Sequence, residues 1–214
     1  MSSIYDGFFA RIPRKLLANI SNSCTLGDKA FQQVMESDPN LLRSPYMYGL
    51  RSRIHDKAVQ MYMHERIETS GLARVYCKDT GFGNRVAAIC GDNFNLMPCH
   101  ISEKGALPSP AKYKIKACEN NPGQDYGQLN LFTPPYAENF SNISFFVTIF
   151  FDGMVTVPTV VLPDKTFSKI LNSWPISAVV ASDMPNEDQV YQERLLPKLL
   201  SEVQNENRQN QRNG

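Results

Sequence analysis

The sequence predicts an α+β fold in which N-terminal helices pack on a mostly antiparallel β-sheet and further helices follow at the C-terminal end. Three observations lead to this prediction. Apolar residues recur at helical spacing through the first 70 residues. From about residue 72 the apolar period changes to two, which is typical of strands. Helical spacing returns after residue 163.

Two helices are predicted between residue 13 and residue 38. Pro13 suits the first turn of a short helix, because its fixed φ matches the helix and its missing N–H needs no partner there. Thr25 suits the N-cap of a second helix, with Asp28 as an acidic residue in its first turn. Asp38 and Pro39 are then expected to end that helix.

The third predicted helix has the clearest boundaries in the sequence. Ser44 suits its N-cap, Pro45 its first position and Gly71 its C-terminal end. One narrow apolar stripe at 100° per residue is expected to face the core. Its members are Met47, Leu50, Ile54, Ala58 and Met61. The remaining surface of this helix is polar and is expected to be exposed.

A strand-rich region is predicted from residue 72 to residue 162. The main strands are expected at residues 74–78, 85–90, 94–101, 111–117, 143–151 and 154–162, with a short one at 129–132. The segment 143–151 is apolar on both faces, as expected for a central strand that is covered on both sides. Asp152 and Gly153 then form a hairpin signal.

The C-terminal part is predicted to be mainly helical. Helices are expected at residues 164–174 and 187–203, with one short strand at 176–181 between them. The chain then reads as a single domain over residues 1–203, with a helical part at 1–71, a β-rich part at 72–162 and a mainly helical part at 163–203. Residues 204–214 are polar and are expected to form a disordered tail.

Charge and composition exclude several classes of protein. The 22 Lys and Arg residues nearly balance the 21 Asp and Glu residues, so no overall basic field attracts nucleic acid and no acidic field mimics it. No apolar run reaches the roughly 20 residues that span a bilayer, and the N-terminal residues lack the pattern of a signal peptide. Five cysteines at irregular spacing suit reduced thiols. We therefore expect a cytoplasmic protein that does not associate with a membrane.

No motif predicts a cofactor, a metal site or a catalytic residue. The sequence contains no Walker lysine motif, Rossmann fingerprint, nucleophile elbow, Cys-x-x-Cys pair or His-x-x-x-His pair. A metal site assembled only in space is one alternative, and its candidate ligands are Cys77, Cys90, Cys99, His100 and Cys118. Another alternative is a Cys99 nucleophile with His55 or His64 as its base.

Two groups of basic residues are candidates for contact with a partner. The first group lies on or before the third helix and comprises Arg43, Arg51, Arg53, Lys57 and Arg66. The second group is a ladder on one face of the predicted strand 111–117 and comprises Lys112, Lys114 and Lys116. Such residues contact phosphate backbones. Local pairing on an exposed helix and protection of a sheet edge explain the two groups equally simply.

These observations favour a non-enzymatic binding or regulatory protein. Its partner is expected to be a nucleic acid or an anionic protein surface that contacts the basic helix at residues 44–70. One alternative is a hydrolase or nuclease whose site forms only in the fold, and a second is a structural or assembly subunit. No residue pattern indicates the ligand or the oligomeric state.

Overall fold

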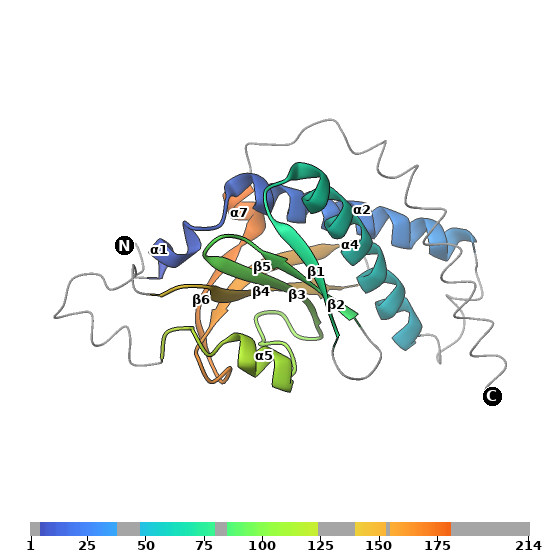
Figure 1. Cartoon of the computed structure of the whole chain (residues 1–214). Coiled ribbons are helices and arrows are strands. Elements are labelled where there is room, and N and C mark those ends of the chain that lie inside the picture. The colour runs from blue at the N-terminus through green and yellow to red at the C-terminus, as the bar shows by residue number, and fades with distance from the viewer. Residues whose placement is uncertain (1–4, 38–47, 80–84, 124–139, 153–154, 181–214) are drawn as a thin grey trace.

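The computed structural model describes residues 5–37, 48–79, 85–123, 140–152 and 155–180. Within them, long helices cover one face of a six-stranded sheet, and a short helix lies on the other side of it (Figure 1). The predicted α+β class, with N-terminal helices before a mostly antiparallel sheet and short helical structure after it, is confirmed.

The described elements follow one another along the chain with short connections. They are α1 (Asp6–Phe9), α2 (Arg14–Ser37), α4 (Tyr48–Ser70), β1 (Arg74–Asp79), β2 (Arg85–Cys90), β3 (Phe94–Ile101), α5 (Lys112–Ala117), β4 (Ile143–Phe151), β5 (Thr156–Pro163), β6 (Ile170–Pro175) and α7 (Ile176–Val180). The predicted strand at 129–132, the final helix at 187–203 and the tail at 204–214 lie outside the described residues. Among the described helices, none has the length and apolar character needed to cross a bilayer.

The strands lie in the sheet in the order in which they occur in the chain. Every neighbouring pair is antiparallel except β3 and β4, which are parallel and align Leu96 with Phe145. A parallel pair needs a long crossover, and α5 lies in this one, on the side of the sheet opposite α2 and α4 (Figure 1). The sheet is therefore covered on both faces.

Strand β4 is the centre of the core, as its apolar sequence predicts. Phe145 and Val147 are fully buried in the cluster that joins the sheet to α1, α2 and α4. Phe146, on the other face, is fully buried with Cys118 and Phe167 in the cluster beneath α5. Alternate side chains thus fill two separate apolar layers, which makes this strand the main structural support of the fold.

The two helices predicted between residues 13 and 38 are one continuous helix, α2. Thr25 is not an N-cap, because its hydroxyl donates to the backbone oxygen of Ser21, 3.3 Å away and one turn earlier. The buried face runs without a break from Leu16 to Met35. Packing along this whole face outweighs the weak local capping signal.

Helix α4 packs with a wider face than the predicted stripe. The buried residues are Ile54, His55, Ala58, Val59, Tyr62, Met63, Arg66 and Ile67, so two adjacent stripes face inward. Gly71, with φ of 65°, follows the end of the helix as predicted, while the expected start at Ser44 lies outside the described residues. The backbones of α2 and α4 approach so closely that a Cβ on Gly27 would lie 2.4 Å from Cγ2 of Val59.

Three short elements differ from the prediction. Residues 111–117 do not form a strand, because Lys112–Ala117 is helix α5. Residues 164–174 form a loop and strand β6 in place of a helix, since the buried carboxylate of Asp164 accepts the backbone N–H groups of Ser168 at 2.7 Å and Lys169 at 2.9 Å. The expected strand at 176–181 is replaced by helix α7.

Candidate functional site

The basic residues predicted to contact a partner along α4 are not equally available. Arg53 is exposed, and Arg51 and Lys57 are half-buried in the same N-terminal half of the helix. Arg66 is only 4% exposed, which leaves little of its side chain for a partner to contact. Arg43 lies outside the described residues. The basic stretch of sequence therefore presents at most a short basic segment near the start of α4.

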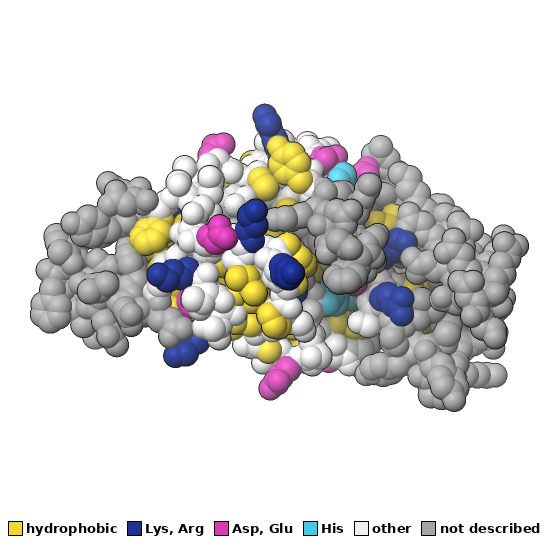
Figure 2. Space-filling view, turned by 60° about the horizontal axis from the view of Figure 1, so that its bottom comes forward, with side chains coloured by type: hydrophobic (Ala, Val, Ile, Leu, Met, Phe, Trp, Pro, Cys, Tyr) yellow, Lys and Arg dark blue, Asp and Glu magenta, His cyan; other side chains and the backbone are white. Residues whose placement is uncertain are grey.

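The predicted lysine ladder does not exist, because its residues belong to helix α5. Lys112 and Lys116 are exposed, but Lys114 is 9% exposed and donates to the backbone oxygen of Ser109 at 2.8 Å. A view onto the side of the molecule that carries α5 shows described Lys and Arg side chains in separate places, with hydrophobic and acidic side chains between them (Figure 2). The two basic groups do not merge there into one patch.

A groove of about 1300 Å³ lies beside strand β1 at the C-terminal end of α4. Four segments line it: the residues before α2, the end of α4, the first half of β1 and the turn between β2 and β3. Its lining residues are Arg11, Pro13, Glu68, Gly71, Leu72, Ala73, Arg74, Val75, Tyr76, Cys90, Gly91, Asp92, Asn93 and Phe94. The groove therefore combines one edge of the sheet with one end of the helical layer.

Strand β1 gives this groove its shape, because β1 is the first strand of the sheet and so lies at its edge. Ala73 and Val75 are half-buried and pack against the main core cluster. Arg74 and Tyr76 alternate with them and are exposed, Tyr76 by 51%. Among the described residues, no strand pairs with the outer edge of β1.

The far wall of the groove is held in place by specific contacts. The N–H of Gly91 donates to the backbone oxygen of Phe94 at 3.0 Å and closes the turn between β2 and β3. A Cβ on Gly91 would lie 2.3 Å from the Phe94 ring, so the turn needs glycine at this position. Arg11 donates to the backbone oxygen of Phe140 at 2.5 Å, which fixes its guanidinium at the other end.

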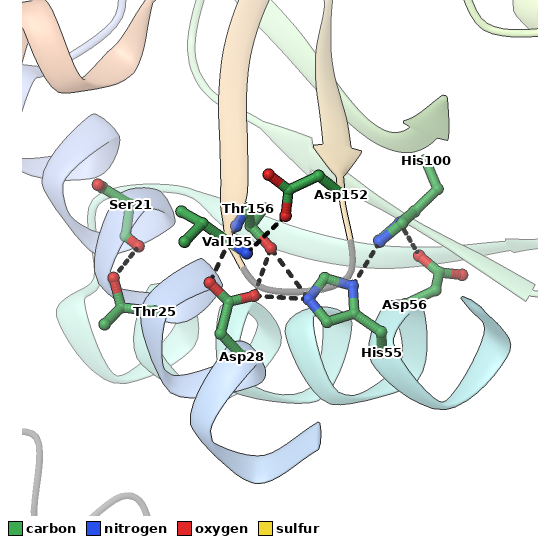
Figure 3. A network of polar contacts seen from close by, with 9 residues as sticks. All are labelled: Ser21, Thr25, Asp28, His55, Asp56, His100, Asp152, Val155 and Thr156. Atoms are coloured by element: carbon green, nitrogen blue, oxygen red, sulfur yellow. Dashed lines mark hydrogen bonds and ion pairs between the residues drawn. The ribbon is translucent and has the colours of Figure 1, made fainter. Parts of the chain in front are cut away.

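A second feature is a buried polar cluster at the N-terminal half of α4, which we call the histidine cluster. It comprises Asp28 from α2, His55 and Asp56 from α4, His100 from β3 and Thr156 from β5 (Figure 3). These residues converge where the two long helices cross the ends of the central strands. Five positions spread over 129 residues of sequence thus meet in one place.

The histidine cluster is a chain of short contacts. His55 Nε2 lies 2.7 Å from an oxygen of Asp28, and His55 Nδ1 lies 2.9 Å from Nε2 of His100. His100 Nδ1 lies 2.6 Å from an oxygen of Asp56, in an orientation that makes this contact an ion pair more than a linear hydrogen bond. The backbone N–H and the hydroxyl of Thr156 both donate to Asp28. Carboxylate, imidazole, imidazole and carboxylate follow one another in a row (Figure 3).

Burial decreases along this row from the helix crossing toward the surface. The side chain of His55 is fully buried, that of His100 is 17% exposed and that of Asp56 is 36% exposed. The ring of Phe151 stacks on His55 with 3.8 Å between centroids, and Phe31 contacts the same ring edge-on. Aromatic rings therefore seal the inner histidine from solvent.

Asp56 at the outer end titrates as part of this cluster. Burial opposes its ionisation, but contact with His100, a 2.9 Å hydrogen bond from Gln60 and the field of His55 outweigh burial. The net effect is that the pKa of Asp56 lies below its usual value. The carboxylate is therefore the stable form of this group in the folded protein.

The histidine cluster does not have the geometry of a general base. Both ring nitrogens of His55 and both of His100 contact other members of the cluster. A catalytic histidine needs one nitrogen directed at the substrate, while its second nitrogen is oriented by a carboxylate or similar group. Thr156, the hydroxyl nearest to His55, is 8% exposed.

The cysteines do not form a reactive or metal-binding site in the described part of the chain. Burial raises the pKa of Cys99 to about 11 and that of Cys118 to about 12, so both are thiols near neutral pH. Cys24, Cys90, Cys99 and Cys118 are free. Residues 5–37, 48–79, 85–123, 140–152 and 155–180 hold no group of three or more His, Cys, Asp or Glu residues placed to bind a metal.

Comparison of the chain with models of protein families, with curated proteins and with solved structures found no match.

Proposed function

We propose that this protein is a non-enzymatic binding protein that engages another protein by taking an extended segment of it into the groove beside β1. The observation that carries the proposal is the exposed edge strand β1, which lies along a groove of about 1300 Å³ and presents Arg74 and Tyr76 to it. An extended peptide that adds to such an edge gains main-chain hydrogen bonds, while alternate side chains supply specificity.

The chemistry of the groove favours a peptide over a nucleic acid. Its lining contains two arginines, Arg11 and Arg74, and two carboxylates, Glu68 and Asp92, so its formal charges cancel. A nucleic-acid site instead concentrates basic residues along the phosphate backbone. Leu72 and Val75 add apolar surface between the charges, and tyrosines such as Tyr76 are enriched at protein interfaces.

Two observations support binding over catalysis. The nitrogens of the buried histidines contact one another and their carboxylates, and the buried thiols have raised pKa values. Neither group offers an activated nucleophile or base to a substrate. The cytoplasmic location is part of the same proposal and is supported by the four free cysteines. Subcellular fractionation of the native protein tests it, and recovery from an oxidising compartment would contradict it.

The direct experiment is site-specific photo-crosslinking in cells. A photoreactive phenylalanine analogue replaces Tyr76 in the groove, and in a control protein it replaces Ile115 on α5, which is similarly exposed at 42%. We expect the Tyr76 probe to form one dominant adduct with a second protein, and the Ile115 probe to lack that adduct. Identical adducts from both positions would contradict the groove as the site.

Three further outcomes of this experiment are informative. An adduct with nucleic acid at position 76 would replace the peptide partner by the nucleic acid expected from the sequence. An adduct with a second copy of this chain would make the protein an assembly subunit. Arg74→Glu should reduce the adduct at least tenfold, while Arg53→Glu on α4 should leave it unchanged. The reverse pattern would return the binding surface to the basic segment of α4.

A further inference from the structure

The contact between His55 and His100 requires a hydrogen atom between the two rings. Nδ1 of His55 and Nε2 of His100 lie 2.9 Å apart, which is a normal hydrogen-bond distance. If both nitrogens were unprotonated, two lone pairs would face each other at that distance in a largely buried site, and the contact would be repulsive. One of the two nitrogens must therefore carry a hydrogen.

The other two contacts of the row also need one hydrogen each. Nε2 of His55 faces an oxygen of Asp28 at 2.7 Å, and Nδ1 of His100 faces an oxygen of Asp56 at 2.6 Å. Two neutral imidazoles and two carboxylates hold two hydrogens in total, which is one fewer than the three contacts need. The third hydrogen is an additional proton, and it changes the formal charge of the row from −2 to −1.

The surroundings favour this additional proton. Partial burial penalises the charge of −2 more than the charge of −1. Titratable groups approach the row from every element packed against it: Cys24 and Asp28 on α2, His55 and Asp56 on α4, Cys99 and His100 on β3, and Tyr113 and Lys114 on α5. Lys114 is the one cation in this set other than the histidines.

We propose that the row is a proton-binding site in which one proton, shared between His55 and His100, locks α2 and α4 onto β3 and β5. The elements joined are the two helices and two strands whose side chains form the contacts of the row. Loss of the proton places two lone pairs face to face and breaks the link between α4 and β3. This site lies at the opposite end of α4 from the groove and does not depend on the proposed function.

A proton fits this position better than a metal ion. A stable metal site needs further ligands beyond two imidazoles, and the described part of the chain places no third His, Cys, Asp or Glu with them. The stacked ring of Phe151 covers one face of His55. A proton, in contrast, needs only the two nitrogens that are present.

The proposal fixes the sign of a pH effect. The unfolded chain releases its histidine protons at about pH 6.5. The folded row keeps one proton above that pH, so the folded state then binds more protons than the unfolded state. Stability must fall as the pH rises, and the folding equilibrium constant should drop by up to about tenfold per pH unit until the row releases its proton.

The test compares urea unfolding of three proteins between pH 6 and pH 9. His100→Gln places an amide beside His55 that can donate an N–H without titrating, so this variant should lose the fall in stability above about pH 6.5. The control His64→Gln changes the exposed histidine of α4, 41% exposed and 3.6 Å from Glu68, and should keep the wild-type slope. Equal slopes for the wild type and His100→Gln would overturn the proposal.

A second measurement on the wild-type chain keeps the proposal testable if His100→Gln does not fold. Nuclear magnetic resonance of protein labelled with ¹⁵N-histidine reports the protonation of each ring nitrogen. After treatment with EDTA, at pH 7, we expect the two facing nitrogens to have shifts intermediate between the protonated and unprotonated forms. Two unprotonated shifts would overturn the proposal. A spectrum that EDTA itself alters would replace the proton by a bound metal ion.

Discussion

The two ends of helix α4 place polar residues in opposite situations. At its N-terminal half, His55 and Asp56 form part of the histidine cluster, where each polar group contacts another member. At its C-terminal end, the helix meets β1 beside a groove in which Arg74 and Tyr76 are exposed. Both regions join the helical layer to the sheet, yet only the second leaves side chains for another molecule to contact. A polar residue in such a junction holds the fold where its partners are internal and recognises a ligand where they are not.

This difference has an energetic consequence. A buried pair of charged groups adds little net stability by itself, but removing one partner leaves the other buried without compensation. Exposed side chains rearrange and hydrate after a substitution, so their removal costs little. The histidine cluster should therefore be far more sensitive to substitution than the groove.

Asp28→Ala should have the largest effect on stability. Asp28 accepts from His55 and from the backbone N–H and hydroxyl of Thr156, and His55 is fully buried. Its removal leaves these donors without an acceptor, and we expect a loss of about 3–5 kcal/mol in the free energy of unfolding. Urea denaturation measures this loss. Glu36→Ala on the exposed face of the same helix is the control and should change stability by less than about 0.5 kcal/mol. Similar losses in both variants would contradict a special role for the cluster.

The sequence was sufficient to predict the class of fold and most of the central strands. The expected boundaries of 85–90, 94–101 and 143–151 agree with β2, β3 and β4. In each case the period-two pattern and the turn residues agree with the tertiary packing. Strand β4 in particular is long, apolar on both faces and bounded by turns, so local and global preferences coincide.

Short segments were predicted wrongly where tertiary contacts decide between two patterns. Lys112–Ala117 alternates as a strand would, but as a helix it places Tyr113 and Ala117 one turn apart against the apolar layer beneath the sheet. In residues 164–174 the apolar spacing is helical, yet Asp164 organises a loop and Phe167 adopts a positive φ of 58°. Six to ten residues carry too little local energy to resist such contacts.

The histidine cluster could not be predicted from the sequence, because its members have no common local spacing. Asp28 matched the first turn of a helix, and His55 was considered as part of a basic helix flank or as a base for Cys99. One signal was present: His55 follows Ile54 and precedes Ala58, so it lies beside the buried stripe of α4. A histidine in that position needs a buried partner, but the sequence does not identify His100, Asp28 or Thr156 as that partner.

A smaller effect is expected in acid, at the outer end of the cluster. The folded state lowers the pKa of Asp56 below its model value of 3.8, so its contribution to stability is present above that pH. This contribution is lost as the pH falls through the folded pKa, because the unfolded state then binds the proton more readily. Since the side chain is 36% exposed, solvent screening limits the effect to about 0.5–1 kcal/mol. Acid titration of stability for Asp56→Asn and the wild type should show a shallower loss in the variant. Parallel curves would contradict the prediction.

The smallest effect on stability is expected from Tyr76→Ala, and a second tyrosine provides its control. Tyr76 on β1 is 51% exposed, whereas Tyr62 on α4 is 1% exposed and lies in an apolar cluster. Truncation of Tyr76 should cost less than about 1 kcal/mol, mostly in strand preference. Truncation of Tyr62 to alanine should cost about 3–5 kcal/mol, because it leaves a large cavity between α2 and α4. Urea unfolding of both variants measures the contrast. If Tyr76→Ala destabilised the fold as strongly as Tyr62→Ala, the groove would be part of the structural core, and exposed side chains there would no longer indicate a surface for a partner.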